Sequence, residues 1–221
     1  PPETYIARLA GHGVEVRRDE ILTSSLATAA YLQQTDSTGT SVFVVGGDGL
    51  REAMRDAGFD LVLRTSAPAE IVVAGIDFDL TYDKLADAAL HIQHGARFVG
   101  TNPDRTFPSE AGLLPGAGTI LAALSHCTGV QPTIVGKPER LMFDIAMGRL
   151  GHPPERTAMI GDRLDTDILG GRRAGLRTIL VRSPAHAAPP GEAHDVAPDL
   201  AFDGLPELTA RPSSGTAGYN D

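Results

Sequence analysis

The sequence predicts an α/β protein built on a largely parallel β-sheet. Apolar runs of about 4 to 6 residues alternate along the chain with segments of helical periodicity. Strands that helices cover on both faces are continuously apolar, as these runs are. With 221 residues, 42% of them hydrophobic, the chain can form one domain or two modest ones.

Two segments that favour helix open the chain. Residues 3–11 have a helical pattern that stops near Gly11 and Gly13, where glycine is typical of a helix end. The stretch "EILTSSLATAAYLQQ" has a short apolar start and then a second helical run. The polar stretch "TDSTGT" (35–40) marks the first candidate boundary.

A regular alternation of strands and helices follows. We expect strands at "SVFVVGG", "FDLVLRT", "EIVVAGI" and "ARFVGTN", with helices at "DGLREAMRDAG" and "TYDKLADAALHIQHG" between them. This order is typical of βαβ units, whose strands run parallel.

Residues 103–118, "PDRTFPSEAGLLPGAG", are rich in proline and glycine and predict a long loop. Long loops on a rigid scaffold often carry binding groups. The alternation then resumes with a helix at 119–127, a strand at "TIVGKP", a helix at 139–150, a strand at "RTAMIGD", a helix near 165–174 and a strand at "RTILVRS".

Charge and cysteine content exclude some classes of function. The net charge of -9 disfavours binding to a nucleic-acid backbone, so we expect no nucleic-acid partner. Cys127 is the only cysteine, which rules out an internal disulfide and favours a reducing, cytoplasmic setting. No apolar run approaches 18 residues, so we expect no membrane partner either.

Lys137 and Asp162 each follow an apolar strand at the point where it ends. In an open α/β sheet, ligands gather at the carboxyl ends of strands. Asp162 can ligate Mg²⁺ there, since this cation takes one or two carboxylates together with phosphate oxygens. Lys137 offers a point charge for a phosphate. From the residues alone, Asp162 could equally cap the following helix, and Lys137 could be an ordinary surface lysine.

Three other patterns do not predict a site. The acids Asp162, Asp165 and Asp167 have the wrong spacing for an EF-hand calcium loop, and Asp165 fits a solvated acid of the first helical turn. The "GGDG" at 46–49 lacks the dinucleotide fingerprint. His91 and His94 have no third metal ligand nearby in the sequence.

The stretch "GKP", followed about 25 residues later by "GDRLDTDI", resembles motifs III and IV of the haloacid dehalogenase superfamily. The similarity is greatest to its class IIA members, the capped para-nitrophenyl phosphatase, phosphoglycolate phosphatase and ribonucleotide phosphatase group. It extends over about residues 5–208, through "EILTSSLATAAYL", "VFVVGGDGLREAM" and the stretch from "VAGIDFDLTYDKL" to "LLPGAG".

The resemblance implies a Rossmann-like core with a large inserted α/β cap. The core would comprise residues 1–38 and 132–208, the cap residues 39–131, and a disordered tail residues 209–221. It also implies a Mg²⁺-dependent phosphatase that acts on a small phosphorylated metabolite through an aspartyl-phosphate intermediate. Lys137 would hold the nucleophile and the phosphate in place, and Asp162 would ligate Mg²⁺. Asp167 would support the site without contacting the substrate or the metal.

The cap loop "TNPDRTFPSEAG" (101–112) would face the core site in this family and help to select the substrate. Asn102, Thr106 and Phe107 are therefore candidate substrate-binding residues. Asn102 and Asp104 could instead only build the turn, as such side chains readily do.

Asp77 and Asp79 in "IVVAGIDFDLT" imitate the family's nucleophile motif, Asp-x-Asp-Gly, and Thr101 could imitate its motif II. However, Leu80 stands where the motif has glycine. The class IIA register also places this segment in the cap, where Asp77 and Asp79 would be loop acids at a strand end.

We expect the true nucleophile motif to belong upstream of the segment matching Tyr5 to Leu9, so that this chain by itself is inactive. The alternative function is a non-catalytic, ligand-binding or dimerising remnant of the family. The resemblance also implies a homodimer formed through the cap.

Overall fold

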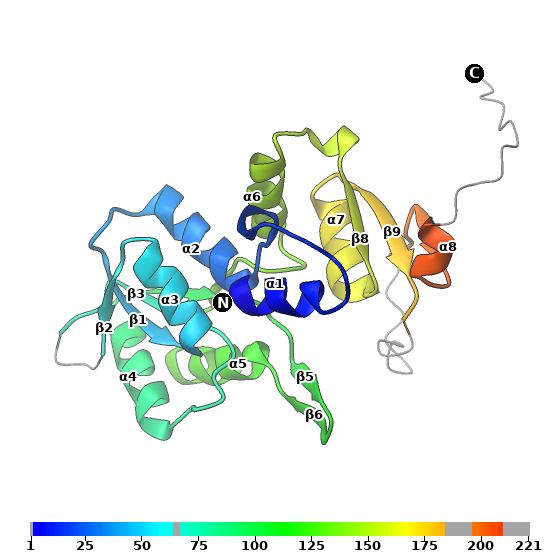
Figure 1. Ribbon diagram of the computed structural model, residues 1–221. Coiled ribbons are helices and arrows are strands. Elements are labelled where there is room, and N and C mark those ends of the chain that lie inside the picture. The colour runs from blue at the N-terminus through cyan, green and yellow to red at the C-terminus, as the bar shows by residue number, and fades with distance from the viewer. Residues whose placement is uncertain (1, 64–66, 184–195, 210–221) are drawn as a thin grey trace, which may run out of the picture. The chain divides into compact units, whose positions relative to one another are not determined.

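The computed structural model describes residues 2–63, 67–183 and 196–209 (Figure 1). These residues form two compact units, Pro1–Gly151 and His152–Asp221, and each is considered by itself. Most of the tail predicted to be disordered, residues 210–221, lies outside the described residues. No helix within the described ranges is long and apolar enough to cross a membrane.

The first unit is built on a five-stranded parallel sheet with the order β2-β1-β3-β4-β7. The alternation predicted from the apolar runs is confirmed, because each of these strands falls within a stretch that the sequence marks as a strand. The strands are β1 (Ser41–Val45), β2 (Asp60–Val62), β3 (Ile71–Ala74), β4 (Arg97–Gly100) and β7 (Thr133–Ile134).

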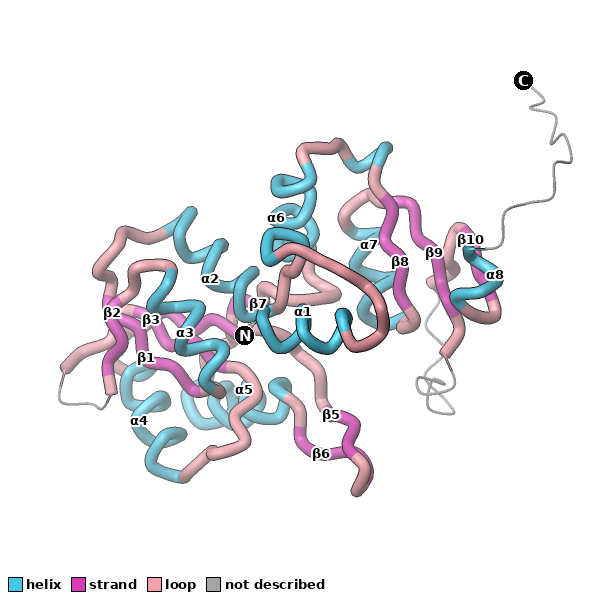
Figure 2. Tube along the Cα trace, in the orientation of Figure 1, coloured by secondary structure: helices cyan, strands magenta, loops and turns pink. Residues whose placement is uncertain are grey.

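Helices cover both faces of this sheet (Figure 2). Helices α2 (Ser24–Thr35), α3 (Asp48–Asp56) and α6 (Arg140–Leu150) pack on one face, and α4 (Tyr82–Gln93) and α5 (Ala117–Thr128) on the other. Alternate strand residues serve the two cores: Val42 and Val44 face α2 and α3, whereas Phe43 and Val45 face α4 and α5. Burying each such side chain stabilises the fold by roughly 1.5–3 kcal/mol.

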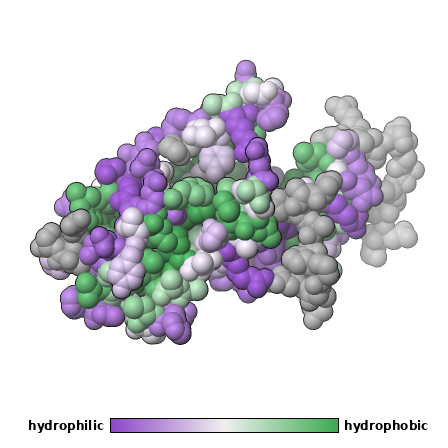
Figure 3. Space-filling view, turned by 90° about the horizontal axis from the view of Figure 1, so that it is seen from below, coloured by the Kyte–Doolittle hydropathy of each residue, from purple (hydrophilic) through white to green (hydrophobic). Residues whose placement is uncertain are grey.

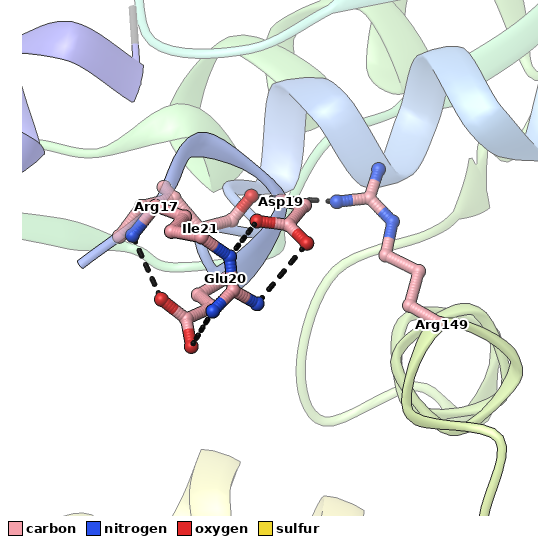
Figure 4. Close-up of polar contacts among 5 residues, drawn as sticks. All are labelled: Arg17, Asp19, Glu20, Ile21 and Arg149. Atoms are coloured by element: carbon pink, nitrogen blue, oxygen red, sulfur yellow. Dashed lines mark hydrogen bonds and ion pairs between the residues drawn. The ribbon is translucent and has the colours of Figure 1, made fainter.

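The chain reaches this sheet through α1 (Pro2–Ala10) and a short 3₁₀ helix, η1 (Arg18–Glu20). Figure 4 shows how polar contacts hold the second of these. The Glu20 carboxylate accepts a hydrogen bond from the backbone N–H of Arg17 at 2.7 Å, and the Arg17 guanidinium pairs with Asp19 at 3.0 Å. The guanidinium of Arg149, at the end of α6, donates to the carbonyl of Ile21 at 3.4 Å. The last of these contacts ties the segment after η1 to α6.

The stretch predicted as a long loop contains a β-hairpin, so that prediction is wrong in this part. Strands β5 (Thr106–Ser109) and β6 (Gly112–Pro115) pair antiparallel, and all eight residues are exposed. Gly112 has a φ of 123°, which favours glycine, and Ser109 Oγ donates to its carbonyl at 2.8 Å. The sequence does not reveal the hairpin because its prolines are typical of loops and neither face of it is buried.

The second unit contains a three-stranded parallel sheet with the order β10-β9-β8. Strands β8 (Ala158–Gly161) and β9 (Arg177–Val181) were expected, whereas β10 (Leu200–Phe202) and α8 (Leu205–Thr209) were not. The helix expected near 165–174 is present, but its first turn, Leu164–Ile168, is a π-helix that continues as α7 (Leu169–Arg173). A short 3₁₀ helix, η2 (Pro154–Arg156), precedes β8.

The compact units do not coincide with the predicted core and cap. Strand β7 and helix α6, both within the predicted core range of 132–208, pack with the sheet of the predicted cap. Helix α2, from the predicted core segment 1–38, packs against α3 and α6. The core and cap boundaries stay a prediction from the family resemblance.

Candidate active site

The site residues predicted from the sequence lie in both units. Lys137 follows β7 in the first unit, and Asp162 and Asp167 follow β8 in the second. Each of these two strands runs parallel to its neighbour, so both residues stand at the carboxyl edge of a sheet, as the sequence predicts.

The position of Lys137 is set by the backbone just before it. The Gly136 N–H donates to the Thr101 carbonyl at 2.7 Å, which extends the pairing of β4 and β7 beyond the strands. A Cβ atom at position 136 would lie 2.2 Å from that carbonyl oxygen, so only glycine fits. The half-buried Lys137 is therefore presented from a rigid turn.

Asp162 stands in a turn that the carboxylate of Asp167 organises. Asp167 is 4% exposed, and its Oδ2 accepts hydrogen bonds from the backbone N–H groups of Asp162 and Arg163, each at 3.2 Å. A Cβ atom at Gly161 would lie 2.4 Å from the same oxygen. Close packing of Gly161 on Asp167 thus fixes the backbone from which the partly exposed Asp162 projects.

A π-helical turn carries Asp167 to this position. The N–H groups of Asp167 and Ile168 both donate to the Arg163 carbonyl, at 3.0 and 3.1 Å. Single π-turns of this kind are rare in proteins, and those that occur are often found at functional sites. Asp165, on the same turn, pairs with the Arg163 guanidinium at 2.6 Å, and both side chains are one-third exposed. Asp165 was expected to be a solvated acid of the first helical turn, and it is instead a half-buried partner of Arg163.

The donors present fit a magnesium ion. Within the described ranges no three or more histidine, cysteine or acidic side chains gather in the manner of a protein-only metal cage. Mg²⁺ does not need one, because it keeps several waters and binds through one or two carboxylates and substrate phosphate. The Asp162 carboxylate, at a strand end and with its backbone held by Asp167, has the chemistry that such a ligand requires.

The predicted substrate-binding residues lie at the base and on the first strand of the hairpin. Asn102 is occupied within the turn: its Oδ1 accepts from the Thr101 hydroxyl at 2.8 Å and its Nδ2 donates to Asp104 at 2.5 Å. Thr106 and Phe107 belong to β5 and are exposed. Asn102 thus builds the turn, whereas Thr106 and Phe107 are accessible to a ligand.

Asp77 is buried and paired. Its side chain is 2% exposed and its two oxygens lie 3.0 and 3.3 Å from Nζ of Lys84, on the first turn of α4. Lys84 also donates to the Asp79 carbonyl at 2.7 Å, and the Asp79 N–H donates to Asp77. The Asp-x-Asp pattern here closes a loop onto α4.

His91, one of the two histidines considered as metal ligands, has structural surroundings. His91 is 3% exposed; its Nδ1 accepts from the Ala69 N–H at 3.3 Å and its ring lies 5.0 Å from that of Phe43. Burial lowers the pKa of His91 below its ordinary value, so the neutral form is favoured. Cys127 is an exposed free thiol.

Sequence reasoning missed two contacts of this region. It did not pair Lys84 with Asp77, although the two residues are only seven positions apart. It also missed the contact between the rings of Phe78 and Phe107, whose centroids are 5.6 Å apart at 71°. No sequence signal joins these two phenylalanines, because they follow different strands.

Family models show that this α/β chain, with a carboxylate and a lysine at strand ends, belongs to a class of hydrolases. The model of haloacid dehalogenase-like hydrolases matches residues 1–60, and a HAD-hydrolase-like model matches residues 134–208. The chain belongs to the haloacid dehalogenase superfamily, as a phosphatase of class IIA.

Relatives with printed activities are phosphatases. An acid sugar phosphatase of Staphylococcus aureus is 39% identical over 209 residues, which cover 95% of this chain and 80% of the relative. The structure of a p-nitrophenyl phosphatase from Archaeoglobus fulgidus matches with a TM-score of 0.86 and 33% identity, over 94% of this chain and 80% of that one. A glycerol phosphate phosphatase of Mycobacterium tuberculosis, in complex with calcium, matches with a TM-score of 0.77 and 34% identity, over 81% of this chain and 53% of that one. The predicted family, fold class and enzyme class are confirmed.

Proposed function

We propose that this protein is a Mg²⁺-dependent phosphomonoesterase that acts on a small phosphorylated metabolite through an aspartyl-phosphate intermediate. The observation that carries the proposal is the turn Gly161–Asp167, where a buried carboxylate holds the backbone of a strand-end aspartate. Family membership supplies the reaction class.

Each of the three residues has a distinct role. The ammonium group of Lys137 places a positive charge beside the phosphate and the nucleophile. Asp162 provides a carboxylate ligand for Mg²⁺. Asp167 touches neither substrate nor metal and acts through the two N–H groups that it fixes. When bound, Mg²⁺ would neutralise charge on the phosphate oxygens as the bond to phosphorus changes.

The nucleophile of the family is an aspartate of the motif Asp-x-Asp-Gly, and no such motif stands in the sequence of 221 residues. The nearest imitation, Asp77, is buried against Lys84, which disfavours it as a nucleophile. We therefore assign no nucleophile within this chain, and we propose that a polypeptide of residues 1–221 has little or no activity by itself.

The substrate class follows from the relatives. They are named for acid sugar phosphatase, p-nitrophenyl phosphatase and glycerol phosphate phosphatase activities, so the proposed substrates are small organic phosphate monoesters. The net charge of -9 makes a nucleic-acid substrate unfavourable. We also propose a cytoplasmic setting, because the sequence has a single cysteine. A homodimer formed through the predicted cap is proposed from the family resemblance.

The test is hydrolysis of a panel of phosphate esters by the intact gene product, with Mg²⁺ and with a chelator. Asp162→Asn and Lys137→Met should each lower kcat by at least about 100-fold, since each removes a charge that acts on the transition state. Arg140→Met is the matched control, because it removes an exposed cation that pairs only across one helical turn with Asp144. Chelator-resistant turnover, or full activity of Asp162→Asn, would contradict the proposal.

A second candidate function is a non-catalytic ligand-binding or dimerising protein. The pairing of Asp77 with Lys84 favours this second function, since no acid of the 221-residue sequence stands in an Asp-x-Asp-Gly pattern. The intact gene product would then bind phosphate esters without turning them over in the panel just described.

A further inference from the structure

The turn that presents Lys137 packs against residues 101–104, the segment that leads from β4 into the hairpin. The Thr101 carbonyl accepts a hydrogen bond from the Gly136 N–H at 2.7 Å, and the Thr101 N–H donates to the Ala74 carbonyl at 2.9 Å. Thr101 is also buried, with 3% of its surface exposed. The backbone just before Lys137 is therefore fixed by its contact with Thr101.

Asn102 lies next to the same turn, and its side chain braces the segment. A Cβ atom at Gly136 would lie 3.1 Å from Cβ of Asn102, so the two residues are in close contact. The Asn102 amide accepts from the Thr101 hydroxyl at 2.8 Å and donates to the Asp104 carboxylate at 2.5 Å. Both ends of the amide thus fix the shape of the segment against which Gly136 packs.

Asp104 is anchored to the start of α5. Its carbonyl accepts a hydrogen bond from the Gly118 N–H at 2.8 Å. A Cβ atom at Gly116 would lie 2.3 Å from the same carbonyl oxygen, so helix and segment approach as closely as glycine allows. Asp104 is therefore a fixed point, and Asn102 connects it to the residues that hold Lys137.

One side of the segment faces a pocket rather than packed side chains. Pro103, between Asn102 and Asp104, borders an open pocket of about 630 Å³ together with Leu121 and Ile134. Figure 3 shows the side of the molecule that carries α5 and the hairpin, with apolar side chains gathered in its middle. Because packing is incomplete beside Pro103, the shape of the segment depends on hydrogen bonds, and the Asn102 amide makes two of them.

We propose that Asn102 is a positioning residue, which holds the turn of Lys137 in place through Thr101 and Gly136 and does not bind the substrate. This inference rests on the proposed function, in which the ammonium group of Lys137 acts on the phosphate. Its physical basis is the sensitivity of catalysis to geometry, since a displacement of roughly 1 Å can cost about 100-fold in rate.

The test measures kcat and KM of the intact gene product with Mg²⁺ for p-nitrophenyl phosphate and glycerol phosphate, which differ in their organic groups. Asn102→Ala should lower kcat about 10-fold, and by the same factor for both esters, because Lys137 acts on the phosphate that they share. Thr119→Val is the matched control and should leave kcat unchanged. It removes a hydrogen bond of the hairpin base, from the Thr119 hydroxyl to the Arg105 carbonyl at 2.9 Å, and leaves those of Asn102 intact.

Two double variants separate positioning from contact with the substrate. In the Lys137→Met protein, Asn102→Ala should cause no further loss, because no lysine is left to position. Asn102→Asp should lower kcat as Asn102→Ala does, since it places two carboxylates side by side. Asn102→Asp/Asp104→Asn should recover most of that loss, because the hydrogen bond between the two side chains forms again with its direction reversed. This exchange also keeps the test valid if Asn102→Ala fails to fold.

Three results would overturn the inference. The first is a wild-type kcat in Asn102→Ala, or an exchange variant no more active than Asn102→Asp. The second is an Asn102→Ala effect that persists at full size in the Lys137→Met protein. The third is a factor that differs between the two esters, because Asn102 would then contact the organic group. Full activity of Lys137→Met would contradict the proposed function instead.

Discussion

Two turns of this protein place an aspartate at the carboxyl end of an apolar strand, and their surroundings differ. Asp77, after β3, is buried and bound on both oxygens by the ammonium group of Lys84. Asp162, after β8, is partly exposed, and a second carboxylate holds its backbone in place. The first arrangement neutralises an acid inside the fold, whereas the second presents one outward.

The comparison teaches that the groups around an acid decide its role more than the local pattern does. "DFDL" is the closer imitation of a nucleophile motif, yet its carboxylate serves to close a loop. The acids of "GDRLDTDI" are close in sequence, but their environments differ. On the π-turn, Asp167 is buried, whereas Asp165 forms an ion pair with Arg163. We therefore expect the turn of Asp162 to take part in the reaction and the turn of Asp77 to contribute to the stability of the fold.

Among variants that keep the side chains of Lys137 and Asp162, the largest effect is expected from Gly161→Ala. The new Cβ atom would lie 2.3 Å from Cβ and 2.4 Å from Oδ2 of Asp167, so the turn that presents Asp162 must shift. We expect kcat of the intact gene product to fall by about 100-fold, the cost of misplacing a catalytic group by roughly 1 Å. Gly148→Ala is the matched control, because nothing lies within 4 Å of a Cβ atom there. Equal activity in both variants would mean that Asp167 does not position Asp162.

Lys84→Met should be a stability variant. It leaves the Asp77 carboxylate buried without its cation, which we expect to cost about 3 kcal/mol in the free energy of unfolding, measured with urea. The double variant Lys84→Met/Asp77→Asn should recover part of that loss, since the buried charge is gone. Arg140→Met, which breaks an exposed pair with Asp144, should change the free energy by less than about 1 kcal/mol. A Lys84→Met protein as stable as the wild type would refute the structural role of Asp77.

A smaller, pH-dependent effect is expected from His91 on the same helix as Lys84. Its folded pKa lies below the ordinary value of 6.5, so the unfolded chain binds more protons below that pH. The stability that neutral His91 confers is complete above about pH 6.5 and declines as the pH falls below it. His91→Gln should flatten this decline between pH 6.5 and 5 in urea titrations. If the variant keeps the wild-type slope, another group causes the decline.

The sequence predicts much of the fold because the main sheet is buried. Strand β3 (Ile71–Ala74) is continuously apolar, and β1 (Ser41–Val45) is apolar after its first residue, so hydrophobicity and the flanking turns predict the positions of both. The hairpin could not be predicted in this way, because none of its residues is buried and its pairing depends on backbone hydrogen bonds. The strand Leu200–Phe202 is three residues long and too short to show a period.

The sequence suggests which residues belong to the candidate site, but it does not predict the contacts that hold them in place. Lys137 and Asp162 follow from their places at strand ends and from the family motifs. The close approach of Gly161 to Asp167 and the pairing of Asp77 with Lys84 depend on a π-turn and on the path of a loop. Neither contact has a periodic sequence signal. The physical difference between the turns of Asp77 and Asp162 is therefore visible only in the structure.

The central claim is that Asp162 ligates the metal and Asp77 does not. Its most direct test is the affinity of the intact gene product for Mn²⁺, measured by electron paramagnetic resonance as a substitute for Mg²⁺. Asp162→Asn should weaken Mn²⁺ binding by at least about 10-fold, since it removes a direct ligand, whereas Asp77→Asn should bind as the wild type does. Weakened binding in Asp77→Asn together with unchanged binding in Asp162→Asn would contradict the claim.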